Sequence, residues 1–287
     1  MNTAQVPDDH LPLAFRALVE GHPPIEPVAL VVAHPDDEVI GVGGQLARWS
    51  RNLLCVYATD GAPADGADAR WAGFPNRAAY AQARAAESRD ALDRAGIGAN
   101  HIHTLGFADQ ELVFALTKLD AAIERLLAQI RPAIVITHAF EGGHPDHDAL
   151  ALVLATLVAR RRARNEHAPL LVEFAGYWED ASGALITNRF ASPAMGGERQ
   201  LRMSIPHRQQ KDTLMACFQT QQRVLHSFNS RQEWIRPAPA YDFRALPNQG
   251  RVWYERFHWA VSGEEWLRLS AAYLDRTPTH GPLRLVC

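Results

Sequence analysis

Blocks of apolar and polar residues alternate along this chain. Between residues 28 and 177, five short segments that indicate strands alternate with longer segments that have helical patterning. The first run, 28–33, has no polar residue at alternate positions, which indicates a strand buried on both faces. We expect strands over 28–33, 53–59, 101–106, 133–137 and 170–175, and helices over 45–52, 77–95, 116–130 and 147–164.

Such an alternation predicts a Rossmann-like, doubly wound α/β fold, with a mostly parallel sheet and helices on both faces. In the common strand order 3-2-1-4-5, the first and fourth strands are neighbours. The regular pattern fades after Tyr177. We therefore expect an N-terminal extension (1–27) with one short helix over 13–20, an α/β core (28–177) and a cap of irregular α and β structure packed on that core (178–287). Within the cap we expect helices over 206–227 and 263–274 and a loop over 236–247.

The composition narrows the class of protein. The 287 residues are 47% hydrophobic and 21% charged, with a net charge of -3, which is ordinary for a globular protein and gives no sign of a nucleic-acid partner. Cys55, Cys217 and Cys287 lie far apart, so we expect no disulfide framework, no thiolate metal site and a reducing, cytoplasmic location. We expect no signal peptide, and the sequence allows a homo-oligomer.

The longest apolar run, 149–159, is too short to span a membrane and is followed by several arginines. Basic residues suit the last turn of a helix. The run is apolar on all sides, so we interpret it as a core helix rather than a lipid-binding one.

The first apolar run leads without a spacer into His34, Pro35, Asp36, Asp37 and Glu38. Carboxylates this close together repel one another, and a bound cation would offset the repulsion. His34 and Asp37 are three residues apart across a turn, so both can reach one ion. The alternative is that the three acidic residues only favour a helix N-terminus.

A similar segment, 138–148, follows the fourth apolar run and contains His144, Pro145 and His147. Because we expect the first and fourth strands to be neighbours, both segments should meet beyond the carboxyl ends of the strands, where such folds bind ligands. This convergence favours a metal site. Imidazole and carboxylate ligands with an open position suit catalytic zinc, with Fe²⁺ or another divalent ion as the alternative. His138 either supports this site or has a structural role.

The segments Ala33-His34-Pro35-Asp36-Asp37-Glu38 and His144-Pro145-Asp146-His147 resemble the PIG-L/LmbE family of metal-dependent de-N-acetylases, and the resemblance covers about residues 28–177. It implies that His34, Asp37 and His147 bind the metal. It also implies that Asp36 is the general base and that His144 takes part in catalysis.

Further residues match that family less closely. Arg84 and Glu87 resemble an Arg-x-x-Glu pair, and Asp109 resembles an acidic residue near the sugar. The segment with Lys211, Thr220 and Gln221 resembles a third motif of that family, a lysine followed by His-x-Ser-Gln. In this chain Phe218 takes the place of the histidine.

Several other side chains have two interpretations. Trp71, in the expected loop 62–76, either stacks on a sugar ring or anchors the loop on the core. His101 and His103 fit hydrogen-bonded histidines better than a second metal site. We expect Trp253, Trp259 and Trp266 in the core rather than at a binding surface.

The expected function is that of a metal-dependent hydrolase that removes an N-acetyl or other N-acyl group from a small-molecule amide. The resemblance implies an N-acetylglucosamine-type sugar conjugate as substrate, with Arg84, Asp109 and Trp71 as candidate substrate-binding residues. One alternative is an amidase acting on a non-sugar N-acyl substrate. The other is a catalytically silent metal-binding or ligand-binding protein, against which the presence of both Asp36 and His144 argues.

Overall fold

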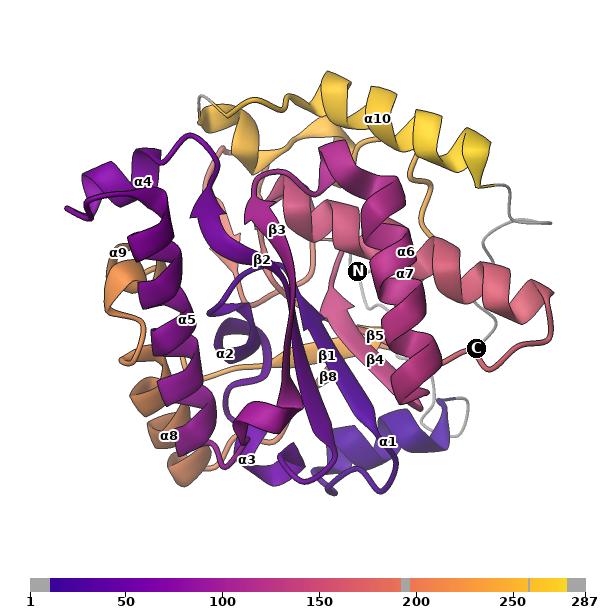
Figure 1. Cartoon of the computed structure of the whole chain (residues 1–287). Coiled ribbons are helices and arrows are strands. Elements are labelled where there is room, and N and C mark those ends of the chain that lie inside the picture. Colours follow the sequence, from indigo (N-terminus) through magenta and orange to yellow (C-terminus); the bar gives the residue numbers. More distant parts are fainter. Residues whose placement is uncertain (1–10, 192–196, 258, 278–287) are drawn as a thin grey trace.

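A computed structural model describes residues 11–191, 197–257 and 259–277 (Figure 1). Within these residues, the main sheet has the strand order β3-β2-β1-β4-β5-β9-β8. The five strands of the α/β core run parallel, in the predicted order 3-2-1-4-5. Their bounds are β1 Val28–Val32, β2 Leu53–Pro63, β3 Ile102–Asp109, β4 Ile134–His138 and β5 Leu170–Phe174.

The central strand β1 is buried on both faces, as its apolar run predicts. Val28, Leu30 and Val32 contribute to one hydrophobic cluster, and Ala29 and Val31 contribute to the other. The first cluster lies under α1 (Leu13–Glu20), α2 (Asp37–Val42), α3 (Leu46–Trp49) and α5 (Arg77–Arg94). The second lies under α6 (Leu116–Ile130), α7 (Pro145–Ala163) and α10 (Gly263–Arg276), so helices cover both faces (Figure 1).

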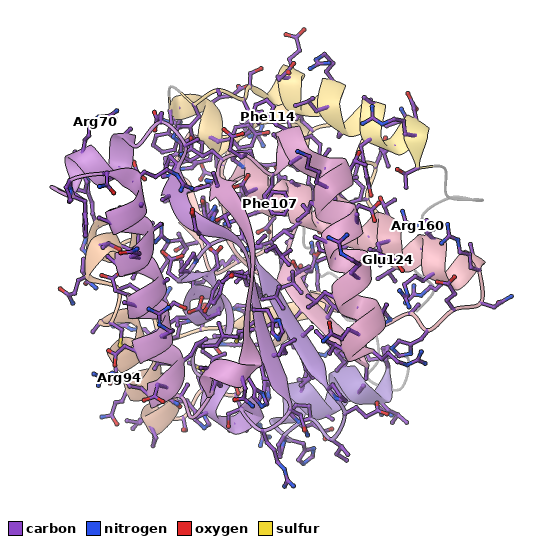
Figure 2. The ribbon with its side chains drawn as sticks, in the orientation of Figure 1. Arg70, Arg94, Phe107, Phe114, Glu124 and Arg160 are labelled. Atoms are coloured by element: carbon purple, nitrogen blue, oxygen red, sulfur yellow. The ribbon has the colours of Figure 1, made fainter. Side chains whose placement is uncertain are left out.

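Helix α7 is a core helix, as its uniform apolarity predicts, with every residue from Ala149 to Val158 buried. It begins at Pro145, two residues before the expected start, because proline is well suited to the first turn of a helix. Near its C-terminal end, Arg160 forms ion pairs with Asp120 and Glu124 of α6 (Figure 2). No helix among the described residues has both the length and the apolar content needed to cross a membrane.

The prediction of one helix over 45–52 is wrong in its bounds. Helix α2 begins at once at Asp37, since Asp37 and Glu38 are favourable in a first helical turn, and α3 follows as a separate short helix. Gly44 lies between them, where a Cβ atom would approach the Met203 sulfur to 2.5 Å. Close packing at this glycine therefore accompanies the division into two helices.

The expected loop 62–76 and helix 206–227 also differ from the structure. The loop contains α4 (Ala67–Trp71), and strand β2 extends to Pro63. In the helical segment, α8 (Ile205–Met215) ends where Phe218 turns into the core. The single-turn η5 (Gln219–Gln221) and α9 (Gln222–Leu225) follow.

The segment after Tyr177 extends the main sheet and also covers its end. Strand β9 (Trp234–Pro237), at the start of the stretch expected to be a loop, pairs antiparallel with β5, and β8 (Arg199–Gln200) pairs with β9. A separate hairpin consists of β6 (Tyr177–Glu179) and β7 (Leu185–Thr187). The hairpin, α9 and the turn η7 (Trp253–Arg256) contribute residues to a cleft at the carboxyl ends of β1 and β4.

Candidate metal centre and active site

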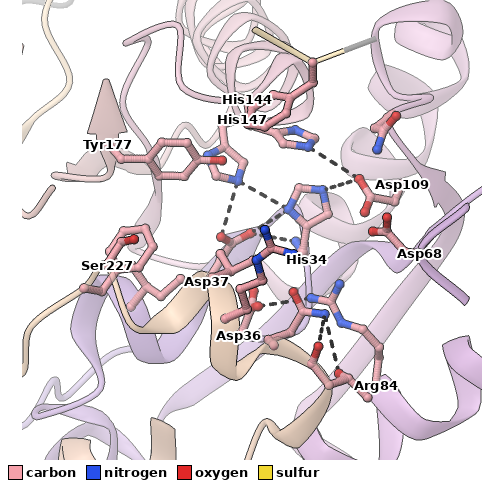
Figure 3. Close-up of a pocket in the computed structure, with 18 of the residues that line it drawn as sticks. His34, Asp36, Asp37, Asp68, Arg84, Asp109, His144, His147, Tyr177 and Ser227 are labelled. Atoms are coloured by element: carbon pink, nitrogen blue, oxygen red, sulfur yellow. Dashed lines mark hydrogen bonds and ion pairs between the residues drawn. The ribbon is translucent and has the colours of Figure 1, made fainter. Parts of the chain in front are cut away.

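The loops after β1 and β4 meet at the floor of a cleft of about 540 Å³ (Figure 3). The His34 Nδ1 atom lies 3.2 Å from Asp37 Oδ2 and 3.3 Å from His147 Nε2. The His147 Nε2 atom lies 3.3 Å from Asp37 Oδ1. We call His34, Asp37 and His147 the ligand triangle; all three side chains are buried.

The spacing of the ligand triangle fits a divalent ion. Zinc bonds of about 2.0 Å in tetrahedral geometry separate ligand atoms by about 3.3 Å. The second ring nitrogen of His34, Nε2, lies 3.0 Å from Asp109 Oδ1 and 3.3 Å from Asp146 Oδ2. These carboxylates favour a proton on Nε2, which leaves the Nδ1 lone pair facing the triangle. Among the described residues, His34 and His147 also belong with His144 to one buried group that could hold a metal ion, and Asp37 and His147 belong with His138 to another.

A second group around His34 Nε2 is less suited to an ion. It consists of His34, Asp109, His144 and Asp146. Both oxygens of Asp146 already accept backbone N–H groups, from Gln110 at 2.7 Å and from Leu112 at 3.0 Å. Asp146 thus joins the loop after β3 to the ring of His34 and positions that ring.

Asp36 lies beside the ligand triangle and forms no part of it. Its Oδ2 atom accepts a 3.1 Å hydrogen bond from Arg84, which also donates to the carbonyl oxygens of Pro35 and Gly61. Burial raises the pKa of the Asp36 carboxyl above its ordinary range, and the Arg84 guanidinium opposes this shift. A carboxyl with a raised pKa is suited to both accepting and returning a proton near neutral pH.

The backbone of Asp36 has a strained conformation, with a φ of 128°. The buried Glu38 carboxylate accepts the Asp36 N–H at 2.9 Å and supports this geometry. The structure therefore gives different surroundings to the three consecutive carboxylates: Asp36 pairs with Arg84, Asp37 belongs to the ligand triangle, and Glu38 holds the turn.

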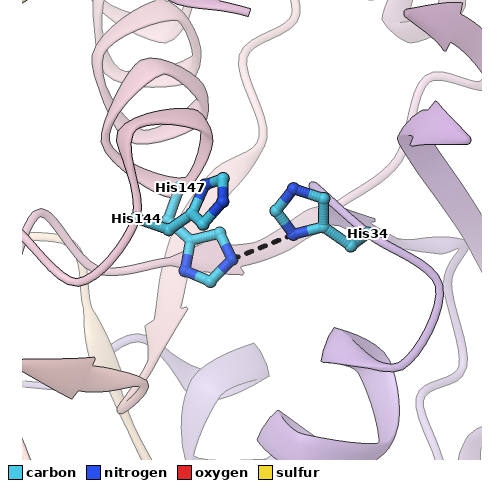
Figure 4. Close-up of side chains that lie close together, drawn as sticks. All are labelled: His34, His144 and His147. Atoms are coloured by element: carbon cyan, nitrogen blue, oxygen red, sulfur yellow. Dashed lines mark hydrogen bonds between the residues drawn. The ribbon is translucent and has the colours of Figure 1, made fainter. Parts of the chain in front are cut away.

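His144 lines the cleft beside His34 and His147 (Figure 4). Its Nδ1 atom accepts the Asp146 N–H at 3.1 Å, so the proton of the neutral ring is on Nε2. Burial lowers the pKa of His144 well below its ordinary value. Nε2 lies 3.5 Å from Asp109 Oδ1.

His138 lies behind the ligand triangle. Its Nε2 atom accepts the Ala33 N–H at 3.0 Å, and its ring stacks on His147 with centroids 3.8 Å apart. This side chain therefore fixes the orientation of the His147 ring and ties β4 to the end of β1. His101 donates from Nδ1 to the Leu53 carbonyl oxygen at 2.9 Å and belongs to none of the metal-binding groups of the described residues.

All the sequence-predicted site residues line the cleft, including Arg84, Asp109 and Trp71. Arg84 is engaged by Asp36 and backbone carbonyls, which leaves it as a support for Asp36. Trp71 is 66% exposed, so it lies at the rim and does not anchor its loop in the core. The Arg223 guanidinium lies over its ring, 5.1 Å from the centroid.

The third, weaker motif supports the wall of the cleft. Thr220 Oγ1 donates to Glu87 at 2.6 Å, and Gln221 donates to the Tyr80 hydroxyl at 2.7 Å. Phe218 is fully buried in the core. Lys211 is buried and pairs with Glu233 at 3.0 Å, away from the ligand triangle.

Sequence reasoning missed much of the aromatic wall of the cleft. Trp266 is a core residue as expected, but Trp253 and Trp259 are half-buried and line the cleft, so the expectation for them is wrong. Tyr177 and Phe257 line the cleft as well. The ring centroids of Tyr177 and His147 are 5.5 Å apart. The exposure of these side chains depends on how the segment after β5 folds back, which no local pattern signals.

Comparisons with known proteins agree with this arrangement. The PIG-L family model, described as GlcNAc-PI de-N-acetylase, matches residues 29–158 of this chain. It ends inside α7, so the cleft walls contributed by later residues lie outside the match.

Two curated relatives share about a third of their matched residues with this chain. A probable N-acetyl-α-D-glucosaminyl L-malate deacetylase 2 of Bacillus cereus is 31% identical over 136 residues, 46% of this chain and 61% of that protein. A 1D-myo-inositol 2-acetamido-2-deoxy-α-D-glucopyranoside deacetylase of Rhodococcus erythropolis is 32% identical over 160 residues, 47% of this chain and 53% of that protein. The chain thus matches little more than half of each relative's length.

The fold is similar to that of a solved deacetylase of the A40926 pseudoaglycone, Dbv21. The TM-score is 0.54 at 21% sequence identity, over 74% of this chain and 96% of that one. This likeness supports the α/β fold with a mostly parallel sheet.

Proposed function

We propose that this protein is a metal-dependent hydrolase that removes the N-acetyl group from an N-acetylglucosamine-type sugar conjugate. The observation on which the proposal rests is the ligand triangle at the floor of the cleft, with Asp36 beside it and the Nε2–H of His144 facing the same space. The two curated relatives, whose names describe deacetylases of 2-acetamido sugar conjugates, support the choice of substrate.

His34, Asp37 and His147 hold the metal in this proposal, and zinc is the ion that two imidazoles and a carboxylate suit best. A bound divalent ion supplies the Lewis-acid chemistry of amide hydrolysis. The chain's own residues handle the protons. The Asp36 carboxylate takes a proton from the attacking water while the water oxygen bonds to the carbonyl carbon of the acetyl group.

The Nε2–H of His144 donates to the carbonyl oxygen, which becomes negatively charged as the new bond forms. When the C–N bond breaks, Asp36 returns its proton to the leaving nitrogen. The products are acetate and a free amine on the sugar. Arg84 holds Asp36 in position, and the segment after Tyr177 shapes the cleft that receives the rest of the substrate.

Metal content and acetate release test this proposal together. The purified wild type should contain about one zinc or other divalent ion per chain and should release acetate from N-acetylglucosamine conjugates. Asp37→Ala and His147→Ala should lose both the metal and the activity, while His101→Ala, outside the cleft, should keep both. A wild type that binds metal but hydrolyses no N-acyl substrate would favour a silent binding protein.

A further inference from the structure

A row of aromatic side chains runs from His144 to the solvent along one wall of the cleft. The rings of His144 and Trp259 have centroids 4.8 Å apart, and those of Trp259 and Phe257 are stacked at 4.8 Å with 22° between their planes. Phe257 then meets Trp253 edge to face at 6.1 Å. We call Trp259, Phe257 and Trp253 the aromatic ladder.

The ladder is anchored directly to the loop that holds the catalytic histidine. The Trp253 N–H donates to the Gly142 carbonyl oxygen at 2.7 Å. Gly142 has a φ of 75°, and a Cβ there would approach the Arg251 carbonyl oxygen and Val252 to 3.0 Å. The ladder and the loop before His144 are therefore packed too closely to move independently.

The ladder presents an apolar surface to the cleft. Phe257 is 42% exposed and lines the cleft with Trp253 and Trp259. Exposed aromatic side chains gathered at a concave site are characteristic of ligand-binding surfaces. Across the cleft, Trp71 presents a second exposed ring.

Charged groups around the cleft do not favour an anionic ligand on the ladder. Four aspartates line the cleft, Asp36, Asp37, Asp68 and Asp109, against the cations Arg84 and Arg223. Arg84 is bound to Asp36, and Arg223 lies over Trp71 on the opposite rim. Arg256, next to Trp253, is paired with Glu179 at 2.7 Å.

We propose that the aromatic ladder binds an apolar, aromatic aglycone of the sugar conjugate, an inference that rests on the proposed deacetylase function. The aglycone is bonded to C1 of the sugar, next to the C2 atom that carries the amide. With the amide at the ligand triangle, the aglycone therefore starts close to His144, where the ladder begins. Trp253, Phe257 and Trp259 lie outside the PIG-L match over 29–158, so we assign the ladder to this chain's own specificity and not to the shared chemistry.

The test compares two glycosides that carry the same acetyl group, methyl and phenyl 2-acetamido-2-deoxy-α-D-glucopyranoside, on the metal-loaded full chain. The wild type should have a kcat/KM about five- to tenfold higher for the phenyl glycoside, the range expected of one aromatic stacking contact. Phe257→Ala should abolish this preference, so that the ratio of the two kcat/KM values falls to about one. Phe114→Ala removes another 42% exposed phenylalanine, outside the cleft (Figure 2), and should keep the preference.

Binding provides a readout that does not need turnover. Calorimetry with the deacetylated phenyl and methyl 2-amino-2-deoxyglucosides should show tighter binding of the phenyl compound, lost in Phe257→Ala. If acetate is released from both glycosides at equal rates and the two amines bind equally, the ladder assignment is wrong while the proposed function stands. If neither glycoside is hydrolysed, the proposed function fails, and equal binding of the two amines overturns the ladder assignment separately.

A third substrate separates the aglycone from the acyl group. A methyl glycoside with an N-hexanoyl group in place of N-acetyl should gain nothing from Phe257. A rate that rises with the longer acyl chain, depends on Phe257 and is insensitive to the aglycone would overturn the assignment to the aglycone.

Discussion

The Nδ1 atom of His34 lies 3.3 Å from the Nε2 atom of His147, although 113 residues separate the two histidines. Because Asp109 and Asp146 favour the His34 proton on Nε2, the Nδ1 lone pair points at His147. Asp37 completes the triangle with oxygens 3.2 Å and 3.3 Å from these nitrogens. This contact therefore exists only when the loops after β1 and β4 are both in place.

Asp36→Asn should separate catalysis from metal binding. The amide keeps an oxygen for the Arg84 hydrogen bond but cannot take a proton, so turnover should fall by about 10²–10⁴-fold. Metal content should stay at the wild-type level, because no Asp36 atom belongs to the ligand triangle. The measurements are kcat for acetate release and metal analysis of the same sample. Turnover within tenfold of the wild type would exclude Asp36 as the base.

Arg84→Ala should lower both the stability and the activity of the protein. The variant leaves the buried Asp36 carboxylate and the carbonyl oxygens of Pro35 and Gly61 without their donor. Loss of one partner from a buried ion pair costs about 3 kcal/mol in unfolding free energy. Urea denaturation measures this loss of unfolding free energy. Arg94→Ala is the control, because Arg94 pairs with Asp90 on the surface (Figure 2). Equal midpoints for the two variants would contradict the assignment.

Gly143→Ala should disturb the cleft through simple overlap. A Cβ atom there would lie 2.8 Å from the Tyr177 ring and still closer to the Tyr177 carbonyl oxygen, so the loop before His144 must shift. We expect a loss of about 1–3 kcal/mol in stability and a clear loss of activity. Gly176→Ala is the matched control, because its Cβ meets nothing closer than the Glu141 carboxylate at 3.7 Å. Thermal unfolding and acetate release of the two variants check the difference.

Glu141 should make stability depend on pH. Burial raises the pKa of its carboxyl to about 8, although the nearby Arg236 guanidinium opposes the shift. Between the ordinary carboxyl pKa and about 8, the folded state holds a proton that the unfolded state has lost, so stability falls as the pH rises. The loss is at most about 1.4 kcal/mol per pH unit.

Glu141→Gln removes this titration and tests it. The advantage of the wild type over the variant in unfolding free energy should shrink from about pH 5 to about pH 8 and then stay constant. Urea denaturation of both proteins across this range measures the difference. A difference independent of pH would show that Glu141 is ionised in the folded protein throughout.

The alternation of strand-like and helical segments along the sequence was sufficient to predict the five parallel strands and their order. Strand β1 is a continuous apolar run, and the five strands alternate regularly with helical segments that are close to them in sequence. The same order placed the ends of β1 and β4 side by side, and the structure does bring His34, Asp37 and His147 within 3.3 Å of one another.

The rest depended on contacts that local patterns do not record. Strand β9 is a short run in a proline-rich stretch and becomes a strand only because β5 has a free edge to pair with. Trp253 and Trp259 are large apolar residues of a kind expected in the core. Their place in the cleft depends on the path of the chain around Gly142. The bond from Arg84 to Asp36 joins residues 48 apart, and only the family resemblance drew attention to Arg84.

The antiparallel pairing of β9 with β5 protects the sheet. Val172, Glu173 and Phe174 face Pro237, Arg236 and Ile235 in this ladder. A fragment that stopped before β9 would leave β5 as an open, apolar edge strand with unpaired N–H and C=O groups. Such edges recruit strands from other molecules, so a shortened chain would be prone to aggregation even though the ligand triangle lies wholly before Tyr177.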